Sequence, residues 1–565
     1  MKVYRPVLVA LTILVSVLMS TALISSWTEP QVQSQLNLYQ SDLVLNASEW
    51  EVLNQSAQGE ASLRKSFLGD NPIKDAAKNY ETVRDSAQKD LDSLKQGVKA
   101  SKQGTPSSTQ KLQADKLDVE SAPAPLVKSP QNVRGRLIDE LNLRLGVLYA
   151  RGGESDKALQ TWTDLVNTPK AQTSAQQIVP TAEVLQGLWS NPPRLLPNAD
   201  AILSKNLKGW FRFQALSKLY SLQQRPDAAL ALVATEQATA QSAFLRLLAV
   251  GAMPVFGSFL GIAILLTWGI RTFLKQQPDK RLETQGGMDE NPSLMGKELA
   301  DAAISPYQAS APESGSGGIT ASERTMPGAV LWPTETIWQV MVLWFTAFFG
   351  VSYVFVPLVV SLLGIKPSTF DGRLQAYFAR FSYGCLMVVG LGILQISLQP
   401  YIPSVLRWLR LNLKGNWIGW GLGGYFVALP LVLIISLLNQ KLLKDQGGGN
   451  PILEIILQGH DNFTIALLWF LVAVCAPLFE ETLFRGFFLT SLTRYMPAWQ
   501  AIALSGFIFA LAHLNLGDVL PLTLLGMVLG TVYWRSRNLL SSILLHSIWN
   551  SGSFIGLLIL GSSGS

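Results

Sequence analysis

The stretch LLWFLVAVCAPLFEETLFRGFFL, residues 467–489, combines the composition of a membrane span with two adjacent carboxylates. Its only charged residues are Glu480, Glu481 and Arg485. A helix crosses the hydrocarbon core with about 20 mostly apolar residues. Ionisable groups at that depth are costly and usually serve a function. The stretch therefore predicts a transmembrane part of a longer helix, 463–495, that carries a functional site.

Eight further apolar stretches have the length and composition of membrane spans. Hydrophobic residues make up 48% of the 565 residues, and charged residues only 15%, against about 25% in soluble domains. Together with 463–487, the predicted spans are 7–24, 247–270, 337–364, 382–398, 417–439, 498–515, 519–534 and 540–560. We therefore expect an all-α, polytopic membrane protein with about nine spans and an α-helical extramembrane domain between the first two.

The spans divide the chain into five parts. Residues 1–27 are predicted to be an uncleaved membrane anchor, because the apolar run exceeds the roughly 7–15 residues of a signal-peptide core; a cleaved signal peptide is the alternative. Residues 28–243 are polar and helical, and residues 244–274 hold the second span. A flexible, polar linker at 275–335 leads to the multi-span domain at 336–565.

Two segments of the extramembrane region resemble tetratricopeptide units. In LGVLYARGGESDKALQTWTDL, residues 145–165, Tyr149, Ala158 and Trp162 lie near the expected positions. A weaker echo, LSKLYSLQQRPDAALAL, places Tyr220 71 residues after Tyr149, about two repeats of roughly 34. An ordinary helical hairpin domain explains the pattern equally well. If the repeats are real, residues 131–240 would bind a protein partner.

Loop charges predict how the chain crosses the membrane. Lys2 and Arg5 precede the first span, and a basic run at 271–281 follows the second. Because Lys and Arg favour the cytoplasmic side, residues 28–243 are placed on the non-cytoplasmic side. The pattern favours a bacterial inner (plasma) membrane or an internal bacterial membrane. These loops also explain the net charge of +6, so we expect a lipid bilayer and no nucleic acid as partner.

Polar residues in the last spans form the candidate site. Glu481 and Arg485 are four residues apart and can pair on one helix face. This leaves Glu480, about 100° further around the helix, to face the bundle interior. His546 and Asn550 also share a face, because they too are four residues apart.

The depth of a second histidine agrees with that of the carboxylates. Helices 463–495 and 498–515 would form an antiparallel hairpin that turns near Pro497. Glu480 lies 17 residues before this turn and His513 lies 16 after it. Glu480 and His513 are therefore predicted at nearly the same level.

These residues fall into three motifs in successive hydrophobic helices. The motifs are EExxxR (Glu480, Glu481, Arg485), FxxxH (Phe509, His513) and HxxxN (His546, Asn550). In this order they resemble the motifs of the CPBP family, membrane proteases of the CAAX-processing and bacteriocin-processing type. The resemblance covers residues 460–560 and extends to 337–460, but it says nothing about residues 28–243.

The resemblance implies a membrane endopeptidase. Glu480 would activate a water that attacks a peptide carbonyl, in agreement with general-base chemistry. His513 and His546 would bind a metal or stabilise the oxyanion, and Asn550 would donate to the oxyanion or orient the water. Glu481 and Arg485 are assigned mainly to architecture. The substrate would be a membrane-associated peptide or protein.

A zinc ion is the cofactor that the resemblance suggests. Glu480, His513 and His546 make an acceptable three-ligand set with an open fourth position. In the alternative without metal, the Glu and His side chains act directly. The spacing differs from HExxH, so that motif lends no support.

Two other functions fit parts of the sequence. A non-catalytic membrane scaffold would use the repeat-like helices to bind a partner. An ion-coupled transporter would use the same Glu and His residues as a proton path. The transporter predicts inverted repeats, and no such symmetry relates 337–435 to 463–560.

Overall fold

The computed structural model describes residues 4–28, 32–51, 65, 67–103, 130–168, 172–275, 330–364, 372–402, 409, 411–443 and 461–561. Every regular element in these ranges is helical. The predicted linker at 275–335 lies almost entirely outside the described residues.

Eight helices among the described residues are long and apolar enough to cross a membrane, which confirms an all-α, polytopic membrane protein. Two of them contain π-helical segments. The first four are α1 (Arg5–Thr28), α11 (Pro226–Lys275), the run α12–η2–α13 (Thr334–Gly350, Val351–Phe355, Val356–Leu362) and α14 (Gly372–Leu398). The others are α16 (Trp417–Leu443), the run α18–η4–α19–η5–α20 (Asn462–Phe470, Leu471–Cys475, Ala476–Glu481, Thr482–Leu489, Thr490–Leu492), α22 (Val519–Ser536) and α23 (Leu539–Gly561).

The ninth predicted span, 498–515, is shorter than expected. It forms α21 (Ala498–Leu511), a helix of 14 residues. At 1.5 Å per residue this helix is about 21 Å long, short of the roughly 30 Å of a hydrocarbon core. His513 therefore lies beyond the end of the helix, in the turn before η6 (Leu516–Asp518).

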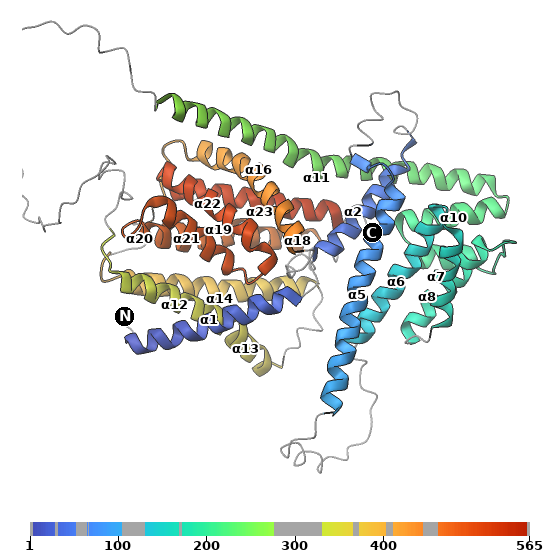
Figure 1. Cartoon of the computed structure of the whole chain (residues 1–565), viewed down its shortest axis with the longest axis horizontal. Helices are drawn as coiled ribbons and strands as arrows, with labels where there is room; N and C mark the ends of the chain where they lie inside the picture. Colours follow the sequence, from blue (N-terminus) through green and yellow to red (C-terminus); the bar gives the residue numbers. More distant parts are fainter. Residues whose placement is uncertain are drawn as a thin grey trace, which may run out of the picture.

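The extramembrane region is a helical domain on one side of the membrane helices (Figure 1). Its helices are α2 (Val32–Ser48), α5 (Pro72–Gln103), α6 (Pro130–Arg151), α7 (Ser155–Asn167), α8 (Gln172–Trp189), α9 (Ala199–Asn206) and α10 (Gly209–Leu222). The buried Trp162 packs on Gly146, where any Cβ would clash with its indole. Both repeat-like segments form helical hairpins, as either interpretation requires, so the tetratricopeptide assignment stays a prediction.

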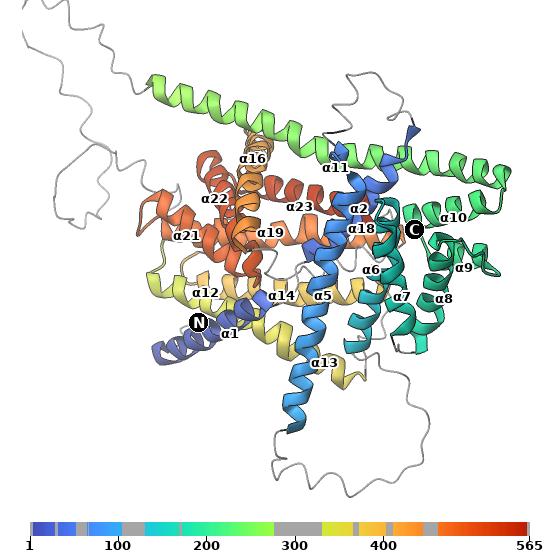
Figure 2. The same cartoon turned by 45° about the vertical axis from the view of Figure 1, so that its right-hand side comes forward.

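Helix α11 joins the extramembrane domain to the membrane helices. Its 50 residues form one continuous helix that extends across both parts (Figure 2). It packs closely on α16 at Gly261, where a Cβ would clash with the carbonyl of Phe426. Small residues allow such close helix packing in membranes. At the far end of α23, Leu560 packs in one apolar cluster with Leu43 of α2 and Leu247 of α11.

The N-terminal helix α1 packs on the membrane domain along its length. Trp338 Nε1 of α12 donates a hydrogen bond of 2.9 Å to Thr12 Oγ1. Near the other end of α1, the Leu516 N–H donates to Ser26 Oγ at 3.0 Å. Helix α1 is therefore a built-in part of the membrane domain.

Candidate active site

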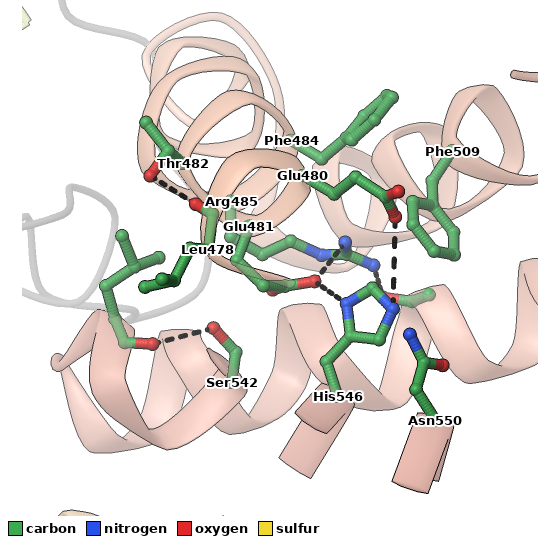
Figure 3. A network of polar contacts seen from close by, with 12 residues as sticks. Leu478, Glu480, Glu481, Thr482, Phe484, Arg485, Phe509, Ser542, His546 and Asn550 are labelled. Atoms are coloured by element: carbon green, nitrogen blue, oxygen red, sulfur yellow. Dashed lines mark hydrogen bonds and ion pairs between the residues drawn. The ribbon is translucent and has the colours of Figure 1, made fainter. Parts of the chain in front are cut away.

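Glu481 forms the buried centre of the site. Its side chain and that of Arg485 are both fully buried, at 0% exposure. Glu481 Oε1 accepts hydrogen bonds from Arg485 Nη1 at 2.7 Å and from His546 Nδ1 at 2.9 Å (Figure 3). The pairing of Glu481 with Arg485, expected from their spacing, is present. Its contact with His546 joins the first motif to the third.

Arg485 is held from several directions at once. Its Nη2 donates to the Gly526 carbonyl at 3.1 Å, and its guanidinium carbon lies 4.5 Å from the centre of the Phe509 ring. A Cβ at Gly526 would lie 2.7 Å from Gly506 Cα and 3.3 Å from Arg485 Nη2. Glycine at 506 and 526 thus allows α21 and α22 to approach closely above the guanidinium.

The contact with Glu481 determines which imidazole nitrogen of His546 is available. An ionised carboxylate only accepts hydrogen bonds, so His546 Nδ1 carries the proton in this contact. The other nitrogen, Nε2, then lies 3.9 Å from Glu480 Oε2. This is too long for a hydrogen bond. The two groups therefore face each other without bonding directly.

Glu480 is oriented by a residue that the sequence analysis missed. Its side chain is 18% exposed, and its Oε1 accepts a hydrogen bond of 3.0 Å from the Tyr383 hydroxyl. Tyr383 lies on α14, 97 residues away. No spacing rule relates such distant positions, and a tyrosine in an apolar helix ordinarily suggests packing or an interfacial anchor.

Gly390 allows Tyr383 to reach the carboxylate. It lies seven residues after Tyr383, on the same face of α14. Phe479 packs against it so closely that a Cβ at Gly390 would lie 2.8 Å from Phe479 Cζ. The Tyr383 ring packs edge-on against Phe479, with centroids 6.1 Å apart. The close approach at Gly390 thus places the Tyr383 hydroxyl over Glu480.

His513 lies apart from the other two motifs. It is exposed, and its Nδ1 lies 2.9 Å from the Phe509 carbonyl in the preceding helical turn. The Phe509 ring contacts both histidines, with centroids 4.9 Å from His513 and 5.7 Å from His546. Phe509 of the second motif therefore connects the two imidazoles through an aromatic contact.

The predicted zinc ligands are only partly brought together. Glu480 and His546 face each other, but His513 does not join them. No group of three His, Cys, Asp or Glu side chains in the described parts of the chain is placed to hold a metal. The arrangement does not fit a three-ligand zinc centre, and zinc binding stays a prediction.

Asn550 satisfies a backbone carbonyl that the neighbouring helix leaves without a donor. In the π-helical turn η4, the Ala476 N–H donates to the Leu471 carbonyl, five residues back. In the same pattern Pro477 would donate to the Val472 carbonyl, but proline has no N–H. Asn550 Nδ2 donates to that carbonyl instead, at 2.9 Å. The predicted oxyanion donor thus has a structural hydrogen bond as well.

Residues 462–552 match the model of the family described as Type II CAAX prenyl endopeptidase Rce1-like. The match includes all six predicted site residues, and it excludes α1 and Tyr383. No curated protein and no solved structure matches the chain.

Proposed function

We propose that the membrane domain is an intramembrane endopeptidase, in which Glu480 activates a water to hydrolyse a peptide bond of a membrane-associated substrate. One observation carries the proposal: Glu480 Oε2 faces His546 Nε2 at 3.9 Å, within the segment similar to an endopeptidase family. Tyr383 donates to the other carboxylate oxygen of Glu480. Glu481 contacts the other ring nitrogen of His546.

The gap between these two atoms suits one water molecule. Two acceptors 3.9 Å apart can each receive one hydrogen bond from the same water at ordinary distances of about 2.7–3.0 Å. With both O–H groups engaged in this way, a lone pair on the water oxygen is free to attack. Glu480 of the first motif and His546 of the third motif would thus hold the water together.

The reaction then requires a single proton carrier. As the water oxygen bonds to the carbonyl carbon, Glu480 Oε2 takes one water proton and the carbonyl electrons move to its oxygen. Collapse of this intermediate restores the C=O bond and breaks the C–N bond. Glu480 delivers its proton to the departing nitrogen and returns to its starting state. General acid–base catalysis of this kind contributes about 10²–10⁴-fold.

Asn550 is the residue assigned to the developing oxyanion. Asn550 has a second amide N–H in addition to the one used by the Val472 carbonyl, and this one would donate to the oxyanion.

We further propose that residues 131–240 recruit the substrate protein on the non-cytoplasmic side of a bacterial inner (plasma) or internal membrane. The helical domain lies next to the C-terminal end of α1 (Figure 1), and the basic residues Lys2 and Arg5 precede α1. The alternatives for the whole chain remain a non-catalytic membrane scaffold, in which these helices bind a partner, and an ion-coupled transporter.

Cleavage by the full chain in lipid vesicles tests the proposal. A library of membrane peptides would be incubated with the wild type and with Glu480→Gln, which keeps the size of the side chain but cannot accept the proton. Glu335→Gln is the matched control, because Glu335 pairs with Arg5 at the surface of the membrane domain. We expect loss of cleavage only in Glu480→Gln. A wild type without activity, or equal activity in all three proteins, would contradict the proposal.

A further inference from the structure

A groove of about 770 Å³ lies between the π-helical turn η2 and the first half of α14. Val351 and Phe355 form one wall, and residues between Tyr377 and Val389 form the other. The volume falls in the range of about 300–1,000 Å³ that is typical of ligand sites. Neither Tyr383 nor any of the predicted site residues lines the groove, so it is distinct from the candidate active site.

The groove opens sideways from two helices that are long and apolar enough to cross a membrane. Phe355 on one wall and Val388 on the other are 47% and 74% exposed. Between the walls, a Cβ at Gly384 would meet no atom within 4 Å. The protein therefore leaves this space open, and the hydrocarbon chains of the bilayer can enter it.

One arginine gives the groove its charge. Among the described residues that line it, Arg380 alone is charged. Arg373, two turns earlier on α14, donates to Asp461 at 2.7 Å, but no carboxylate in the described parts of the chain pairs with Arg380. Its guanidinium carbon lies 5.8 Å from the centre of the Phe470 ring, a contact that leaves the positive charge uncompensated because the ring has no net charge. The groove therefore favours an anionic occupant.

The charged and apolar parts of the groove are arranged like those of a phospholipid. Arg380 lies in the first turn of the candidate span Tyr377–Leu398, at the depth where headgroups meet the hydrocarbon core. Val389 lies nine residues further, about 14 Å along the helix. The hydrocarbon of one leaflet is about 15 Å thick. An acyl chain can thus follow the groove while its phosphate meets Arg380.

An extended peptide fits the groove less well. Its backbone needs hydrogen-bonding partners within a bilayer. Between Phe381 and Val389, the lining offers only the weakly hydrogen-bonding thiol of Cys385. An acyl chain needs no such partners, so the lining favours a lipid over a peptide.

We propose that this groove binds an anionic phospholipid, with the phosphate at Arg380 and one acyl chain between η2 and α14. The ligand is a glycerophospholipid of net negative charge, such as phosphatidylglycerol. Lipid binding here does not depend on the proposed endopeptidase function, because the groove lies outside the residues assigned to catalysis.

The test uses the full chain in phosphatidylcholine vesicles that contain a small fraction of phosphatidylglycerol with a diazirine acyl chain. After irradiation the adducts would be mapped by mass spectrometry, and we expect them between Phe381 and Val389. Arg380→Gln should lower this labelling by about fivefold, as one arginine near an anionic headgroup predicts. Arg271→Gln, at an exposed position of α11 outside the groove, should not change it. Equal labelling of Arg380→Gln and the wild type would overturn the inference.

A second pair of variants tests the groove itself. Gly384→Leu fills the open space and should abolish the labelling. Gly392→Leu makes the same change on the same helix, also where a Cβ meets no atom within 4 Å, but it does not line the groove and should label like the wild type. The thermal unfolding midpoint of each variant shows whether it is folded.

Two other outcomes would also overturn the inference. In the first, phosphatidylcholine with the same diazirine chain labels the groove as strongly as phosphatidylglycerol, which would show that no anionic headgroup is selected. In the second, a short apolar peptide with a free C-terminal carboxylate displaces the phosphatidylglycerol label and its C-terminal amide does not, which would assign the groove to a peptide.

Discussion

Replacing Tyr383 by phenylalanine removes one hydroxyl and retains the ring that packs on Phe479 at 6.1 Å. The lost contact is the 3.0 Å hydrogen bond to Glu480 Oε1. A hydrogen bond to a charged group contributes about 1.5–3 kcal/mol. If this bond is used to hold the general base in position for the transition state, its loss lowers kcat by roughly 10- to 150-fold.

The assay separates positioning from substrate contact. Tyr383 contacts Glu480, so Tyr383→Phe should lower kcat and leave KM unchanged. Tyr377→Phe is the matched control, because Tyr377 lies on the same helix with its ring against Phe463 at 6.4 Å. The thermal unfolding midpoint of each variant, measured in the same vesicles, shows whether the variant is folded. The reasoning is refuted if kcat of Tyr383→Phe stays within about twofold of the wild type, or if only KM changes.

Three further changes test other parts of the structure. Arg485→Met leaves the fully buried Glu481 without its ion-pair partner, so we expect a loss of about 3–5 kcal/mol in the free energy of unfolding; an unchanged unfolding midpoint would contradict this. Gly146→Val introduces a clash with the indole of Trp162 and should lower the unfolding midpoint of the extramembrane domain by calorimetry. Metal analysis of the purified chain should find less than one zinc per chain, because His513 does not join the other predicted ligands; one equivalent that is lost in His513→Ala would show the reverse.

The contacts that could be predicted are those fixed by a single helix. Glu481 and Arg485 are one helical turn apart, so their pairing follows from helix geometry, and the structure contains it. The contact between Glu481 and His546 joins two helices. The sequence analysis assigned His546 to a metal or the oxyanion. The structure orients it through Glu481, because tertiary packing decides which carboxylate meets the imidazole; the assignment itself stays a prediction.

Other features depended on backbone geometry that composition does not report. The segment 498–515 is apolar throughout most of its length, yet its helix ends at Leu511. Leu514 adopts a left-handed conformation with φ of 53°, which few non-glycine residues favour. Nothing about a leucine predicts such a turn. Tyr383 was missed for a related reason, since its role depends on the close approach of Phe479 at Gly390.

The site and the irregularity of its helix depend on the same residues. Because Pro477 has no N–H, it cannot donate a hydrogen bond to the Val472 carbonyl in the π-helical turn. The side-chain amide of Asn550 donates that hydrogen bond instead. A buried carbonyl without a donor is costly in a bilayer. The amide that fills this need is therefore held one helical turn beyond His546, and its second N–H would serve the proposed oxyanion role. An asparagine at 550 can meet both demands, because an aspartate would lose the donors and a leucine would lose both roles.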